Sequence, residues 1–67
     1  MTIQLNGKSV ELPEHVRSID DLLKYYEVAD RIVIVEINKE IPDKKNYSSM
    51  HLSGGDVVEM IHFVGGG

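Results

Sequence analysis

The chain has 67 residues, no cysteine, and a net charge of −4 from 11 acidic and 7 basic side chains. Such a chain folds as one small domain, and the lack of cysteine excludes disulfides, thiolate metal sites and a cysteine nucleophile. The acidic balance disfavours nucleic-acid and anionic-membrane surfaces, and neither a signal peptide nor an apolar run of roughly 20 residues is visible. We therefore expect a cytoplasmic protein that is monomeric when free.

The first twelve residues predict a β-hairpin. Residues 2–6 alternate polar and apolar side chains, which is typical of a half-buried strand with Ile3 and Leu5 inward. Asn6-Gly7 favours a type I′ turn, because both central residues of that turn need positive φ. Residues 9–12 alternate again, and Pro13 ends the second strand because proline cannot donate to the ladder.

Residues 19–27 predict the helix of the domain. Ser18 is a suitable N-cap, and Asp21 stands three residues later as its capping-box partner. The spacing of the apolar residues defines one buried face, with Lys24 pointing away from it. That predicted inner face consists of Ile19, Leu22, Leu23 and Tyr26.

The second half of the chain predicts two long strands around an irregular crossing. Residues 31–37 are β-branched almost throughout, and residues 57–64 form the last strand. Between them we expect a turn at Asn38-Lys39, a loop over 43–49 with one 3₁₀ turn, and a turn over 54–56; residues 40–41 and 50–52 are candidates for short additional strands. One helix can cover one face of such a sheet, so the fold class is α+β, with a mixed sheet of four or five strands. The β-grasp arrangement is the most economical solution, with the first and last strands as parallel neighbours at the centre.

Strand alternation then predicts an apolar patch on the uncovered side of the sheet. If Glu36 and Glu59 face water, the apolar residues of the same parity share their side. Exposed contiguous apolar surface usually marks an interface. Two alternatives remain open: loop 43–53 folds over these residues, or they are isolated exposed side chains without a role. The predicted partner-binding residues are Ile32, Ile34, Ile61 and Phe63, with Val64 beside them at the strand end.

The chain ends in Gly65-Gly66-Gly67. Three glycines contribute nothing to a core, so a fraying end or a linker remnant are two interpretations. The functional interpretation is a flexible thread, in which the absence of Cβ atoms lets Gly65 and Gly66 enter a narrow channel. The terminal carboxylate of Gly67 is then the reactive group.

The sequence resembles the ThiS sulfur-carrier family of thiamine biosynthesis over nearly its whole length. The matching elements are Ile3-x-Leu5-Asn6-Gly7, Ser18-Ile19-x-x-Leu22-Leu23, Val33-x-Val35-x-x-Asn38, Ile41-Pro42, Leu52-x-x-Gly55-Asp56 and Phe63-Val64-Gly65-Gly66-Gly67. The resemblance implies a ubiquitin-like β-grasp domain over residues 1–64 and a flexible tail over 65–67.

The same resemblance implies a mechanism. A ThiF-like E1-type adenylyltransferase activates the carboxylate of Gly67 with ATP and magnesium. Sulfur from a cysteine-derived persulfide converts it to a thiocarboxylate, and a ThiG-like thiazole synthase takes that sulfur. The chain itself then binds no cofactor and supplies no catalytic side chain.

Three other interpretations stay open. A MoaD-like carrier for molybdopterin synthase, or a carrier of the ubiquitin-related-modifier type, shares this fold and tail chemistry. A ubiquitin-type interaction domain would have no chemistry at its tail. An enzyme is disfavoured, because His15, His51 and His62 lack metal-ligand spacing and no nucleophile motif surrounds Ser48 or Ser49.

Overall fold

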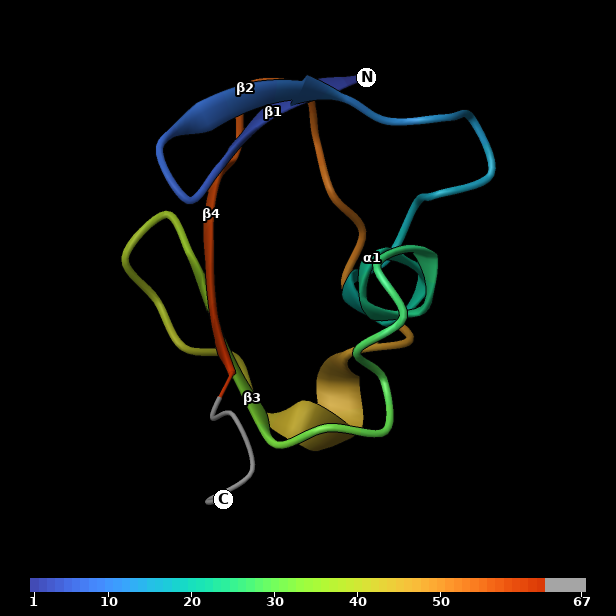
Figure 1. The fold of residues 1–67 in the computed structure, drawn as a ribbon, viewed down its shortest axis with the longest axis vertical. Coiled ribbons are helices and arrows are strands. Elements are labelled where there is room, and N and C mark those ends of the chain that lie inside the picture. The colour runs from blue at the N-terminus through green and yellow to red at the C-terminus, as the bar shows by residue number, and fades with distance from the viewer. Residues whose placement is uncertain (63–67) are drawn as a thin grey trace.

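A computed structural model describes residues 1–62 of the chain (Figure 1). Phe63 and Val64 of the predicted patch, and Gly65, Gly66 and Gly67 of the predicted tail, lie outside the described residues. The boundary proposed between a 1–64 domain and a 65–67 tail therefore stays a prediction.

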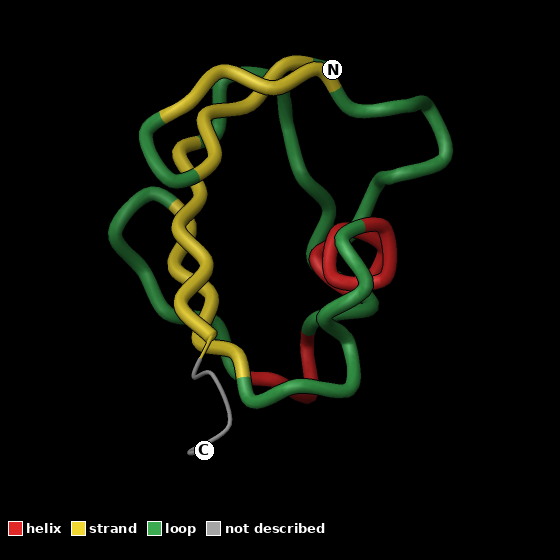
Figure 2. Tube along the Cα trace, viewed as in Figure 1, coloured by secondary structure: helices red, strands yellow, loops and turns green. Residues whose placement is uncertain are grey.

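The described residues form a mixed four-stranded sheet with one α-helix on one side (Figure 2). In the order β2-β1-β4-β3, β1 runs parallel to β4, and the other two pairs are antiparallel. The prediction that the first and last strands are parallel neighbours at the sheet centre is confirmed. This is the β-grasp arrangement. The elements are β1 (Thr2–Leu5), β2 (Lys8–Glu11), α1 (Ile19–Tyr25), β3 (Val33–Ile37), the 3₁₀ helix η1 (Lys44–Asn46) and β4 (Val57–His62).

Both predicted two-residue turns form with positive φ at both central residues. Asn6 and Gly7 have φ of 50° and 83°, and Asn38 and Lys39 have φ of 50° and 69°. Two positive φ values define the type I′ turn, whose twist matches that of the flanking strands. The second turn closes with an isolated bridge between Ile37 and Glu40, so residues 40–41 do not form the additional strand considered above.

The helix begins as the sequence predicts. The Ser18 hydroxyl accepts a hydrogen bond from the Asp21 backbone N–H at 3.0 Å, and the Asp21 carboxylate accepts one from the Ser18 N–H at 3.1 Å. This reciprocal pair is a capping box, which satisfies two of the otherwise unpaired donors at the helix start.

The helix ends earlier than predicted, and the assignment of Tyr26 to its buried face is wrong. Tyr26 is the C-cap and is 38% exposed, and Tyr25 is 43% exposed. Glu27 adopts φ of 59°, and the Val28 N–H donates to the Leu23 carbonyl at 2.9 Å. This is a Schellman ending, which turns the chain out of the helix before Tyr26 can face the core.

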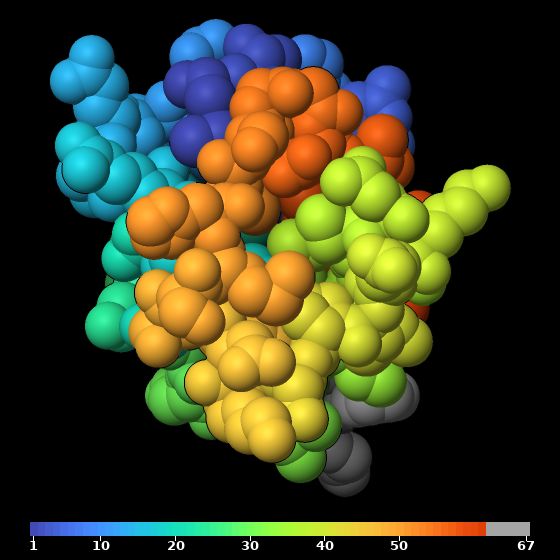
Figure 3. Space-filling view, turned by 180° about the vertical axis from the view of Figure 1, so that it is seen from behind, coloured from blue at the N-terminus to red at the C-terminus, as the bar shows by residue number. Residues whose placement is uncertain are grey.

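The irregular segment over residues 43–53 lies beside the start of α1, where its orange part borders the blue-green residues of the helix start (Figure 3). The Ile19 N–H donates to the Met50 carbonyl at 3.1 Å, and the Leu52 N–H donates to the Arg17 carbonyl at 2.7 Å. Residues 50–52 form only one isolated bridge, His51 to Ser18, and not the additional edge strand. Since this segment is bonded to the start of the helix, the alternative that it covers the opposite sheet face is wrong.

The core lies between the sheet and this helical layer. Val35 and Val58 are fully buried, as the predicted strand parity requires. The remaining buried apolar side chains are Ile3, Leu5, Leu12, Val16, Ile19, Leu22, Leu23, Tyr47 and Leu52. Among residues 1–62, no helix has the length and apolar character needed to cross a membrane.

Candidate functional site

The candidate site begins with β4, because this strand leads directly into the predicted tail. Its parallel pairing with β1 covers only two positions, Gln4 with Val57 and Leu5 with Val58. An asparagine side chain extends the pairing on that side: the Asn6 Oδ1 accepts a hydrogen bond from the Met60 N–H at 2.9 Å. On the other side, β3 pairs with β4 from Val58 to His62. The strand that precedes the tail is thus held from both sides.

A second asparagine fastens the beginning of β4. The Asn38 Oδ1 accepts a hydrogen bond from the Val57 N–H at 2.9 Å, and its Nδ2 donates to the Asp56 carboxylate at 3.1 Å. The other oxygen of that carboxylate accepts from the Ser53 N–H at 2.8 Å. Hydrogen bonds of the Asn38 and Asp56 side chains therefore join the turn after β3 to the turn before β4.

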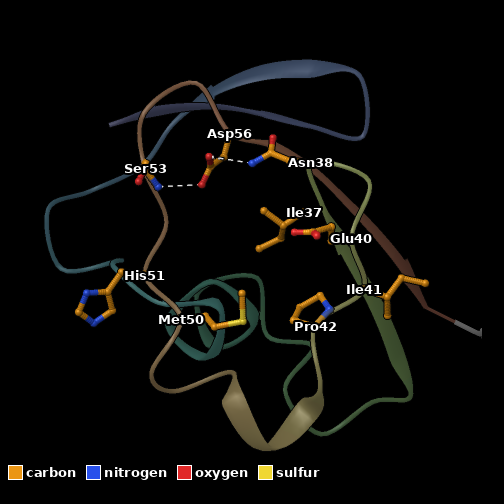
Figure 4. Close-up of a pocket in the computed structure, with 9 residues that line it drawn as sticks. All are labelled: Ile37, Asn38, Glu40, Ile41, Pro42, Met50, His51, Ser53 and Asp56. Carbon is orange, nitrogen blue, oxygen red and sulfur yellow. Dashed lines mark hydrogen bonds between the residues drawn. The ribbon is translucent and has the colours of Figure 1, made fainter.

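Asn38, Ser53 and Asp56 form one end of a surface pocket of about 480 Å³ (Figure 4). Pro42 and Met50 lie toward its other end, with Ile37 and Glu40 between. The amide and carboxylate at the Asn38 end already bond to each other, so they serve the loop rather than an incoming ligand. The residues that line this pocket do not bring a set of reactive groups together.

The side of the sheet away from the helix carries the predicted patch. Ile34 of β3 stands directly opposite Ile61 of β4, and these side chains are 39% and 51% exposed. Val57, on the same face of β4, is 45% exposed. We call Ile34, Glu36, Val57, Glu59 and Ile61 the outer sheet face.

The other predicted patch residues have different outcomes. Ile32 is 74% exposed, but it precedes β3, because that strand begins at Val33 and not at residue 31. Phe63 and Val64 lie outside the described residues. The patch predicted from the sequence did not include Val57, although Val57 has the same strand parity as Glu59 and therefore lies on this face.

The charged residues near the helix start have structural roles. Asp20 pairs with Lys24 at 3.0 Å, one helical turn away. Hydrogen bonds from the backbone N–H groups of Arg17 and Ser18 hold the pKa of Asp21 below its usual value. Asp20 and Asp21 therefore bond to neighbouring groups at the helix start and are not arranged as a catalytic acid–base pair.

No cluster of metal ligands occurs in the described part of the chain. Over residues 1–62, no group of three or more His, Cys, Asp or Glu side chains is placed to hold a metal ion. His15 and His51 are exposed on separate loops. The His15 ring meets the Tyr25 ring edge-on, with centroids 6.3 Å apart.

Known proteins resemble this chain over nearly its whole length. The family model for ThiS matches residues 3–67. The chain belongs to the ThiS family. It is 49% identical over 65 residues to the sulfur carrier protein ThiS of Bacillus subtilis (strain 168), covering 97% of this chain and 98% of that relative.

Solved structures agree with this assignment. The crystal structure of the thiamine biosynthesis protein ThiS from Geobacter metallireducens superposes with a TM-score of 0.81 at 30% identity, covering 100% of both chains. The solution structure of the thiamine biosynthesis protein from the same organism gives a TM-score of 0.82 at 30% identity, covering 100% of this chain and 88% of that one. A ThiS-family chain is a sulfur carrier protein rather than a catalyst.

The geometry explains several residues that carried the family resemblance. Asn6 and Asn38 supply acceptors to β4, and Gly55 adopts φ of 89° in the turn before it. Asp56 closes that turn by accepting from the Ser53 N–H. These residues position the strand that precedes the tail.

Proposed function

We propose that this chain carries sulfur as a thiocarboxylate on Gly67 for the thiazole moiety of thiamine. A ThiF-like adenylyltransferase first uses ATP and magnesium. The Gly67 carboxylate attacks the α-phosphate and pyrophosphate leaves, giving an acyl-adenylate. The terminal sulfur of a cysteine-derived persulfide then attacks the acyl carbon and AMP leaves. A second thiol then attacks the cysteine sulfur of the acyl disulfide and forms a new disulfide with that cysteine. The Gly67 thiocarboxylate is the leaving group and passes to a ThiG-like thiazole synthase.

The observation that carries this proposal is ThiS membership over residues 3–67 together with the sequence Gly65-Gly66-Gly67 after the central strand. The five residues after His62 can reach roughly 16–18 Å when extended, at about 3.3–3.6 Å per residue. Glycines without Cβ atoms suit a narrow channel leading to a nucleotide. The pairing of β4 with both β1 and β3 supports a role for this strand as the anchor of the tail.

The proposal assigns the remaining roles as follows. The chain is a protein co-substrate that binds no cofactor of its own, since the activating enzyme consumes ATP and magnesium. It is monomeric when free and acts in the cytoplasm, where that enzyme finds ATP.

We also propose that the outer sheet face docks on the activating enzyme. Ile34 and Ile61 form a directly opposed apolar pair that the helical layer leaves uncovered. Interfaces concentrate binding energy in a few such apolar anchors. Phe63 follows this pair along the chain, and its docking would direct Gly67 toward the active site.

Intact-protein mass spectrometry tests the chemistry. The chain is incubated with the ThiF-like enzyme of its own genome, ATP, magnesium and a persulfide donor. We expect the mass gain of one oxygen replaced by sulfur, and no gain after deletion of Gly66 and Gly67. The truncated chain should melt within a few degrees of the full chain, because glycines contribute no core contacts. Sulfur loading of the truncated chain would refute the role of the tail.

Calorimetric titration with the ThiF-like enzyme tests the docking face. Ile61→Ser should weaken binding to the activating enzyme by tenfold or more, which corresponds to about 1.4 kcal/mol. Ile41→Ser is the matched control, because Ile41 is 67% exposed but lies in the loop after the β3 turn. Equal losses in both variants would contradict the assignment of this face.

A further inference from the structure

Two acidic residues face each other in the middle of the outer sheet face. Glu36 of β3 stands directly opposite Glu59 of β4. The Ile34–Ile61 pair lies on the same face, two residues away along each strand. Val57 lies on the other side of this acidic pair along β4. Glu59 is exposed and Glu36 is partly buried. The surface is therefore an apolar strip with two carboxylates at its centre.

This arrangement is unfavourable in the isolated domain. Like charges directly opposite each other on neighbouring strands destabilise a sheet. All seven Lys and Arg residues of the chain lie within residues 1–62. The ion pairs in that part of the chain are Met1–Glu11, Lys24–Asp20 and Lys45–Asp43, and none includes either carboxylate. Within residues 1–62, no ion pair therefore neutralises the two carboxylates, which leaves them available to a cation from a partner.

We propose that the activating enzyme seats an arginine side chain between Glu36 and Glu59, within an otherwise apolar contact. This inference rests on the proposed function, because it names the chemistry of the partner at the same docking face. A guanidinium is planar, always charged and presents a fork of N–H donors that matches carboxylates. Ile34, Ile61 and Val57 flank the pair and would exclude water from it.

A metal ion fits this position less well. Calcium takes six to eight oxygen ligands, and magnesium requires near-ideal octahedral geometry. The described residues place no third acidic or histidine ligand beside the pair. Two side chains from flat, neighbouring strands do not form such a cage.

The acidic pair gives the docking face a means of discrimination. A purely apolar surface that covered Glu36 and Glu59 would bury two unpaired charges, which is strongly unfavourable. A partner with a matching cation avoids that cost and also relieves their repulsion. Specificity therefore comes from rejecting apolar surfaces that lack the cation as well as from attracting the correct one.

The test compares charge-removing variants of the whole chain. Glu36→Gln, Glu59→Gln and the double variant remove the repulsion while keeping side-chain shape. Glu59→Lys places a cation opposite Glu36. Glu14→Gln is the control with the same change in net charge as each single glutamine variant, because Glu14 is exposed in the loop between β2 and α1. Each variant is measured by thermal melting, and by calorimetric titration with the ThiF-like enzyme at two salt concentrations.

We expect the double variant to melt a few degrees higher than the wild type and to bind the enzyme at least tenfold more weakly, with a smaller dependence on salt. Glu59→Lys should also melt higher and should bind more weakly still. Glu14→Gln should match the wild type in both measurements.

Four results would overturn the inference. They are unchanged binding of the double variant, an equal loss of binding in Glu14→Gln, a lower melting temperature of the glutamine variants, and stabilisation of the wild type by magnesium chloride that the double variant lacks. Sulfur loading of the wild type, measured separately by mass, shows which proposal fails. If the wild type is loaded with sulfur and the glutamine variants bind the enzyme as tightly as the wild type does, only the arginine proposal is refuted. If the wild type neither binds the enzyme nor is loaded, the proposed function is refuted as well.

Discussion

Substitutions of Asn6 separate two contributions that this one residue makes to the fold. Its backbone has φ of 50° in the first turn, and its side-chain oxygen accepts a hydrogen bond from the Met60 N–H, 54 positions along the chain. Asn6→Asp keeps an acceptor in a residue that tolerates the left-handed region. Asn6→Gly keeps the backbone geometry but loses the acceptor, and Asn6→Ala loses both.

The expected sizes follow from these two features. Loss of one hydrogen bond costs about 0.5–1.5 kcal/mol, toward the lower end here because the Asn6–Met60 contact is exposed and water can replace it. Forcing alanine into the left-handed region adds about 1–2 kcal/mol. Glycine avoids that strain, but it loses more backbone entropy on folding. This entropy loss reduces the stability difference between Asn6→Gly and Asn6→Ala by about 0.5–1 kcal/mol. We expect Asn6→Asp to remain near wild type, Asn6→Gly to lose about 1 kcal/mol, and Asn6→Ala to lose about 2 kcal/mol.

Urea denaturation of the four proteins measures the free energy of unfolding, and equal m-values would show that the comparison is valid. A loss of 2 kcal/mol is large for a domain whose total stability is about 5 kcal/mol. If Asn6→Gly were as stable as the wild type, the side-chain hydrogen bond to Met60 would contribute nothing. If Asn6→Gly and Asn6→Ala were equally unstable, the argument from backbone strain would be refuted.

Three further predictions concern the helix and the turn before β4. Leu23→Ala should cost about 2–5 kcal/mol by urea denaturation because Leu23 is 5% exposed in the core, while Lys24→Ala should be nearly silent; similar losses would contradict the helix register. Asp21 has a pKa below its usual value, so its contribution is present above about pH 4 and is lost as the pH falls through the lowered pKa. Asp21→Asn should therefore be less stable at pH 7 and should lose less stability than the wild type between pH 4 and pH 2, and an unchanged acid profile would refute this role. Gly55→Ala should cost about 1–2 kcal/mol from backbone strain alone, because φ is 89° and no atom lies within 4 Å of an added Cβ; Gly55→Asn should cost less, and a thermal melt that ranks the two the other way would contradict the explanation.

Local signals in the sequence were sufficient to predict the first turn and the helix start. Asn6-Gly7 specifies its turn because few residue pairs accept two positive φ values. Ser18 and Asp21 specify the helix start because their side chains reach backbone groups only three residues away. Membership of the ThiS family was equally visible, since its motifs are spread along nearly the whole chain.

Tertiary contacts decided the irregular elements. Tyr47 lies in the predicted polar loop over 43–49, and Leu52 lies in the candidate strand over 50–52 that continues the same irregular segment, yet both are buried. Backbone hydrogen bonds between this segment and the start of the helix place them there, and no nearby residue encodes those bonds. Tyr26 shows the converse, because its spacing predicts burial but the Schellman ending directs it toward solvent.

The outer sheet face shows the same division within one site. Alternation along each strand predicted that Glu36 and Ile34 share one side, and that Glu59 and Ile61 share one side. Only the register of β3 against β4 placed Glu36 opposite Glu59 and Ile34 opposite Ile61. Side-chain parity repeats every two residues along a single strand and is therefore written in the sequence. Register relates residues more than twenty positions apart, so it is fixed only when both strands pack against the same core.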